Sequence, residues 1–162
     1  MNDCELASAV AARLGNRTLA CAESCTAGRL SQTFVEVDGA EAWFRGGVVA
    51  YQVPVKRSLL GVTELSVLGE AAVAQMAAGA AELFSAEVTI STSGVLGGEP
   101  KDGVDPGTVF VATCVEGSVT SRTHHFDGTS DEMLDAAVRQ ALYDLLSAVA
   151  EPQTASTGRT TP

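Results

Sequence analysis

The chain is short of basic residues and has no long apolar run. Its 162 residues carry ten Lys and Arg against twenty Asp and Glu, a formal net charge of −10. Nucleic-acid binding depends largely on cations that neutralise phosphates, so this charge argues against nucleic acid as a partner. A membrane-spanning helix needs roughly 20 consecutive apolar residues, which the sequence nowhere supplies, so no membrane association is expected.

Secretion signals and cysteine motifs are also lacking. Residues 1–5 include two acidic side chains and no basic start of the kind that opens a signal peptide, so we expect a cytoplasmic protein. The cysteines form no Cys-x-x-Cys pair, which argues against structural zinc and redox motifs and predicts reduced, mostly packed thiols. His124 and His125 are adjacent on a predicted strand and should point to opposite faces, so no metal site is expected.

The apolar 46% of the chain falls into alternating strand and helix patterns. We predict helices over residues 4–14, 27–37, 55–60, 70–84 and 131–149, and strands over 18–22, 44–51, 87–92, 108–115 and 119–126. Residues 93–107 hold five glycines and two prolines, which predict a loop. This order predicts one α/β domain over residues 1–150, with a mixed, mostly parallel sheet covered on both faces. Residues 151–162 lack apolar anchors and are expected to be disordered.

A serine lies at the predicted turn between the first strand and the second helix. The hydroxyl of Ser24 should face the free N–H groups that open the helix, from Cys25 to Gly28, and these groups suit a developing oxyanion. The small side chains of Ala27 and Gly28 would let a substrate approach the backbone. The commoner role of Ser24 or Thr26 at such a position is a plain helix cap.

A lysine at the start of a predicted helix is a candidate partner for this serine. Lys56, one of two lysines in the chain, follows Pro54 and should fall near the third helical position. The partial positive charge there, together with burial, would favour the neutral amine that a general base requires. Tyr51, at the end of the preceding strand, is placed to hydrogen-bond to either group. The simpler interpretation makes Lys56 a solvated surface residue and Tyr51 a rim aromatic.

A glycine-rich segment is the third candidate. The backbone N–H groups between Gly94 and Gly98, Gly97 among them, are suited to cradle a phosphate. The segment lacks the Gly-Lys-Ser/Thr ending of a P-loop, so nucleoside triphosphate binding is not supported. A plain connecting loop fits the same residues equally well.

Taken in order, these segments resemble the CinA C-terminal domain family. Residues 18–28 resemble its opening motif, residues 44–51 with Lys56 and 59–62 its second motif, and the Gly94 loop with 106–109 its third. The resemblance covers about residues 5–149. It implies a three-layer α/β/α sandwich.

Members of that family include nicotinamide-nucleotide amidohydrolases, which convert nicotinamide mononucleotide and water to nicotinate mononucleotide and ammonia. The resemblance places the catalytic serine on Ser24, the tyrosine on Tyr51 and the lysine on Lys56. It implies a small nucleotide as substrate and a mechanism that requires neither a metal nor an organic cofactor. Two further candidates are Arg45, for the substrate phosphate or a surface ion pair, and Glu23, to orient Tyr51 or Lys56 or merely to pack beside them.

The sequence departs from the family pattern at four points. Ala27 stands where glycine is usual, Leu96 replaces a small residue, Gly98 replaces proline, and Gly128-Thr-Ser130 stands where Gly-Asp-Arg is frequent. These departures keep two alternatives open: a nucleotide- or protein-binding module without catalysis, and a serine amidase for another small carboxamide. Homo-oligomerisation is also open, since Trp43 and Phe44 suit a subunit contact, although core placement is the commoner fate of such side chains.

Overall fold

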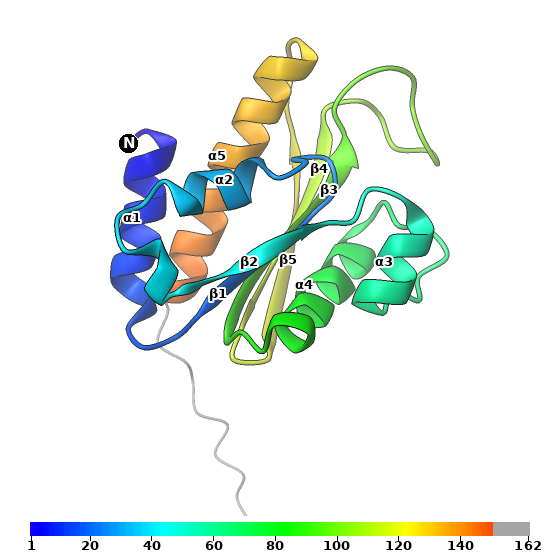
Figure 1. Ribbon diagram of the computed structural model, residues 1–162. Helices are drawn as coiled ribbons and strands as arrows, with labels where there is room; N and C mark the ends of the chain where they lie inside the picture. The colour runs from blue at the N-terminus through cyan, green and yellow to red at the C-terminus, as the bar shows by residue number, and fades with distance from the viewer. Residues whose placement is uncertain (151–162) are drawn as a thin grey trace, which may run out of the picture.

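The computed structural model describes residues 1–150, so the predicted disorder of residues 151–162 lies outside the described residues. Five α-helices and five strands make up this part of the chain, alternating at first and ending in three consecutive strands and a helix (Figure 1). Their bounds are α1 Asp3–Leu14, β1 Leu19–Glu23, α2 Arg29–Val35, β2 Phe44–Val49, α3 Val53–Leu60, α4 Glu70–Phe84, β3 Val88–Val95, β4 Thr108–Val115, β5 Ser118–His125 and α5 Ser130–Ala150, with a 3-10 turn at Ala40–Ala42. Among the residues that the structure describes, no helix is both long and apolar enough to cross a bilayer.

The strands form one mixed sheet in the order β2-β1-β3-β4-β5. Strand β1 pairs in parallel with β2 and with β3, while β4 runs antiparallel to β3 and β5 antiparallel to β4. Four of the five strands therefore point the same way. Strands β1, β3 and β4 are almost entirely buried, which explains why their sequences read as continuous apolar or small-residue runs rather than alternating ones.

Helices cover both faces of the sheet. Helices α1, α2 and α5 lie on one face and α3 and α4 on the other (Figure 1). The first layer closes a large core around Leu6, Phe34 and Leu142, and the second closes a smaller one around Leu60 and Met76. The architecture is the three-layer α/β/α sandwich that the sequence predicts.

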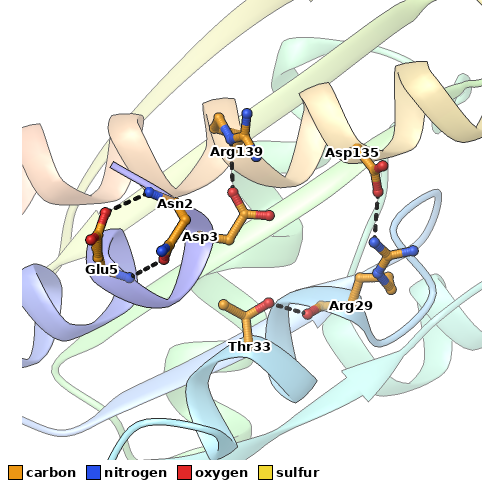
Figure 2. A network of polar contacts seen from close by, with 7 residues as sticks. All are labelled: Asn2, Asp3, Glu5, Arg29, Thr33, Asp135 and Arg139. Carbon is orange, nitrogen blue, oxygen red and sulfur yellow. Dashed lines mark hydrogen bonds and ion pairs between the residues drawn. The ribbon is translucent and has the colours of Figure 1, made fainter.

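Surface ion pairs connect the three helices of the larger layer (Figure 2). Arg139 of α5 donates to Asp3 of α1 at 2.8 Å, and Arg29 of α2 donates to Asp135 of α5 at 2.6 Å. Exposed pairs of this kind contribute about 1 kcal/mol or less each. The packing of these helices is determined by the core, and the ion pairs add little to it.

Several element boundaries differ from the prediction by one to three residues, and two of these differences bear on the site. Helix α2 begins at Arg29 rather than near residue 27, because Ala27 adopts a φ of +47° that no helix contains. Strand β3 continues to Val95, so the predicted loop begins three residues later. A side chain at Gly94 would place a Cβ 2.5 Å from the Thr108 carbonyl oxygen, so this glycine permits close strand pairing and is not part of a loop.

Candidate active site

The turn that carries Ser24 lies at the carboxyl edge of the parallel strands. The connection from β1 to β2 uses α2 on one face, and the connection from β2 to β3 uses α3 and α4 on the other. Open α/β sheets bind ligands at such a switch point. A cavity of about 560 Å³ opens there. Its lining residues are Ser24, Cys25, Tyr51, Gln52, Val53, Pro54, Lys56, Val67, Leu68, Gly94, Val95, Leu96, Gly97, Glu99, Lys101 and Ser130.

Within this cavity Lys56 and Ser24 are in hydrogen-bonding contact. Lys56 Nζ lies 3.0 Å from Ser24 Oγ and donates a second hydrogen bond, of 2.8 Å, to the backbone carbonyl of Tyr51. Lys56 is 3% exposed, so it is not the solvated surface residue of the simpler interpretation. Helix α3 begins at Val53, with Pro54 second, so Lys56 is its fourth residue, one position later than predicted.

The environment of Lys56 favours the neutral amine. Burial lowers its pKa from the ordinary 10.5, the positive charge of Lys101 lowers the pKa further, and Cys25 opposes the shift. Sequence reasoning anticipated the effect of burial but missed Lys101. The available signal was that Lys101 is the chain's other lysine and follows the Gly94–Gly98 segment.

The neighbouring thiol does not compete with Ser24 as a nucleophile. Burial raises the pKa of Cys25 to about 12, so this side chain stays a thiol at neutral pH. Thiols react through the thiolate, which this environment disfavours. The adjacent serine, in contact with an amine of lowered pKa, is the better nucleophile.

Glu23 is fully buried and serves the turn rather than Tyr51 or Lys56. Its carboxylate accepts hydrogen bonds from the backbone N–H groups of Gly28, Leu30 and Ser31 and from the hydroxyls of Thr26 and Ser31. The N-cap of helix α2 is Gly28, which has no side chain to cap the helix, so the interpretation of Ser24 or Thr26 as a plain cap is wrong.

This network also corrects the predicted oxyanion donors. The N–H of Gly28 is taken by Glu23, and the N–H of Ala27 donates to the Ser24 carbonyl at 3.2 Å. Among the described residues, the N–H groups of Cys25 and Thr26 donate to no other residue. Of the two, only Cys25 belongs to the cavity lining, since Thr26 is fully buried, so the Cys25 N–H is the donor next to Ser24 that remains for a ligand.

The cavity brings together only part of the predicted site. Ser24, Cys25, Tyr51, Lys56, Gly94 and Gly97 line it, whereas Glu23, Thr26, Ala27, Gly28 and Arg45 do not. Arg45 follows Phe44, which pairs with Leu19 at the start of β1, while the cavity lies beyond Glu23 at its end. Four strand residues separate these points, about 13 Å. Arg45 is therefore at the wrong end of the sheet to hold a substrate at Ser24.

The four departures from the family pattern have structural consequences. Leu96 lines the cavity, as does Ser130 at the start of α5. Gly98 has a φ of +78°, which proline cannot adopt, so this loop follows a path that the usual proline would forbid. Ala27 also has positive φ, in the left-handed region where glycine is relaxed and other residues pay about 1–2 kcal/mol.

The two histidines take different partners. His124 Nε2 is 2.7 Å from Asp144 Oδ2 on α5, and His125 Nδ1 is 3.2 Å from Thr108 Oγ1 on β4. In the described part of the chain, no group of three or more His, Cys, Asp or Glu side chains is arranged to hold a metal ion.

Fold and site together define an α/β protein with a buried serine–lysine pair at the switch point of its sheet. Residues 3–149 match the CinA C-terminal domain, and the chain belongs to that family. It is 36% identical to a CinA-like protein of Fervidobacterium nodosum over 70% of this chain and 29% of the relative. It is 35% identical to a CinA-like protein of Mycolicibacterium gilvum over 86% of this chain and 35% of the relative. The chain thus spans about a third of the length of these curated relatives.

Solved structures of the same superfamily share the whole fold. The competence damage-inducible protein A of Klebsiella pneumoniae superimposes with a TM-score of 0.90 at 32% identity, covering 94% of this chain and 100% of that one. The competence or damage-inducible protein of Enterobacter asburiae gives a TM-score of 0.89 at 30% identity, covering 93% of this chain and 99% of that one.

Proposed function

We propose that the chain is a serine amidohydrolase that deamidates nicotinamide mononucleotide to nicotinate mononucleotide and ammonia. The observation that carries the proposal is the 3.0 Å contact between Lys56 Nζ and Ser24 Oγ inside a cavity of ligand size. The substrate follows from membership of a family in which some proteins are amidohydrolases of this specificity.

The first half of the reaction forms an acyl-enzyme. A neutral Lys56 amine donates one N–H to the Tyr51 carbonyl, which leaves its lone pair free to face the Ser24 hydroxyl. Lys56 takes the hydroxyl proton as Ser24 Oγ attacks the carboxamide carbon. The backbone N–H of Cys25, which lines the cavity, would stabilise the oxyanion. The Lys56 ammonium then returns the proton to the departing amine, which leaves as ammonia.

The second half repeats the same proton transfers with water. Lys56, neutral again, takes a proton from a water molecule that attacks the acyl carbon, and then protonates Ser24 Oγ as the ester breaks. Nicotinate mononucleotide is released as the free carboxylate. Tyr51 holds Lys56 in position through its backbone carbonyl. Its phenol is not needed for either proton transfer.

The test is ammonia release from nicotinamide mononucleotide by the wild type, Ser24→Ala and a control, Ser8→Ala. Ser8 is an exposed residue of α1, remote from the cavity. We expect wild type and Ser8→Ala to turn over equally and Ser24→Ala to be slower by at least about 1,000-fold, with an unchanged circular dichroism spectrum.

Three results would contradict the proposed mechanism or favour another function. Wild-type turnover in Ser24→Ala would contradict the serine mechanism. Binding of the mononucleotide without ammonia release in the wild type would favour a binding module. Ammonia release from other carboxamides but not from the mononucleotide would favour a serine amidase of different specificity, consistent with Leu96 in the cavity wall.

A further inference from the structure

The cavity holds a second cation that the proposed chemistry does not use. Its charged lining residues are Lys56, Lys101 and Glu99. Lys101 is exposed and, among the described residues, forms no ion pair and no side-chain hydrogen bond. Lys56, in contrast, is buried and hydrogen-bonded to Ser24 and to the Tyr51 carbonyl. Lys101 is thus the cation in this site that is available to a ligand.

A tight turn fixes the backbone of Lys101 at the cavity. The N–H and carbonyl of Lys101 both pair with those of Val104, each at 2.9 Å. The two residues between them, Asp102 and Gly103, have φ values of +51° and +77°, as in the two-residue turns that close β-hairpins. The Lys101 side chain is flexible and its backbone is held in place, so this lysine can contact a ligand bound in the cavity.

An anionic substrate needs such a residue in this protein. The net charge of −10 repels an anion from most of the surface, and Glu99 repels it within the cavity. Arg45, which the sequence offers as a candidate for the phosphate or for a surface ion pair, lies at the opposite end of β2. The charge of Lys101 extends into the site, since it lowers the pKa of Lys56.

We propose that Lys101 binds the anionic group of the substrate and thereby restricts the site to carboxamides that carry a phosphate. This inference rests on the proposed function and adds a specificity-determining residue to it. A lysine can neutralise a phosphate by a charge-assisted hydrogen bond, which typically changes affinity by about tenfold or more.

The experiment compares two substrates that differ in the phosphate alone: nicotinamide mononucleotide and nicotinamide riboside. The proteins are wild type, Lys101→Met, Lys101→Arg and Arg13→Met, the last removing one exposed cation from α1 on the other side of the sheet. We expect Lys101→Met to lower kcat/KM for the mononucleotide about tenfold or more, mainly through KM, and to change the riboside value little. Lys101→Arg should retain most of the wild-type value, and Arg13→Met all of it.

Two results would overturn the proposal: no change for the mononucleotide in Lys101→Met, or an equal loss with both substrates. If the wild type releases no ammonia from either compound, the proposed amidase activity is contradicted. Calorimetric titration with the mononucleotide and with inorganic phosphate then tests separately whether Lys101 binds an anion. Binding that weakens in Lys101→Met but not in Arg13→Met supports Lys101 as the anion site. Binding that is absent, or equal in both variants, overturns it.

Discussion

Lys56 Nζ lies 3.0 Å from Ser24 Oγ, although the two residues are 32 positions apart in the chain. The sheet brings them together, because Glu23 at the end of β1 pairs with Val49 at the end of β2. The segments that follow the two strands therefore leave the sheet at the same edge. One carries the nucleophile and the other carries the base.

Replacement of the base is the first prediction. Lys56→Arg should lower kcat by about 100- to 10,000-fold, because a guanidinium stays protonated and cannot accept the Ser24 proton. Lys56→Met should be equally inactive, since it has no basic atom. Ammonia release under saturating substrate measures both, and near-normal turnover in either variant would remove Lys56 from the role of base.

The pH dependence of turnover follows from the same group. The active form is the neutral amine, and the pKa of Lys56 is lowered from 10.5 by burial and by Lys101. The value of kcat/KM should therefore rise with pH and level off above an apparent pKa lower than 10.5. The other titratable residues that line the cavity are Cys25, Tyr51, Glu99 and Lys101, and Cys25 keeps its proton across the neutral range, since its pKa is about 12. A profile that is flat or falls across the neutral to alkaline range would contradict this assignment.

Stability should depend on pH through Lys56 as well. Between the lowered pKa of the folded state and the ordinary 10.5, the unfolded chain binds more protons, so the free energy of unfolding rises with pH in that window. Below it, the full penalty of burying a charge remains. Lys56→Met removes this penalty, so its stability advantage over wild type should be largest below the lowered pKa and shrink as the pH rises toward 10.5. Denaturant titrations of both proteins at several pH values measure the difference, and a constant difference would contradict the prediction.

The order of strands and helices could be predicted from sequence because each buried strand is a short continuous apolar run. The pairing of Ser24 with Lys56 could be proposed from their chemistry and the family resemblance, and the strand pairing of the structure explains why they meet. The local environment could not be predicted in the same way. Glu23 accepts hydrogen bonds from N–H groups at the start of α2 because the chain turns sharply at Ala27. Ala27 has a left-handed backbone conformation, and residue propensities do not predict it.

The same limit applies to two charged residues. The chemistry of Arg45 suits either a substrate phosphate or a surface ion pair, but its position along β2 follows from the strand register, which periodicity leaves undetermined. Lys101 was overlooked because it lies in a loop, and only the tertiary fold returns that loop to the cavity.

Glu23 provides a test of how far the turn depends on one carboxylate. Both carboxylate oxygens of Glu23 accept hydrogen bonds. Glu23→Gln replaces one of them with an amide N–H₂ group, which would then face hydrogen-bond donors. We expect a loss of about 2–4 kcal/mol in the free energy of unfolding, together with a fall in kcat as the Ser24 turn loosens. Glu82→Gln, an exposed change on α4, is the matched control and should alter neither quantity. Wild-type stability in Glu23→Gln would show that the turn holds without the charge.

Tyr51 is the point at which the structure and the family resemblance lead to different expectations. The resemblance makes its phenol part of the catalytic group, whereas the structure uses its backbone carbonyl, and the side chain is 71% exposed with no hydrogen bond among the described residues. A Tyr51→Phe substitution keeps the carbonyl and removes the hydroxyl. We therefore expect kcat to fall less than about tenfold, against the far larger loss in Lys56→Met, because general acid–base groups contribute about 100- to 10,000-fold. A loss in Tyr51→Phe as large as in Lys56→Met, with unchanged KM, would mean that the phenol moves into the cavity when substrate binds and takes part in proton transfer.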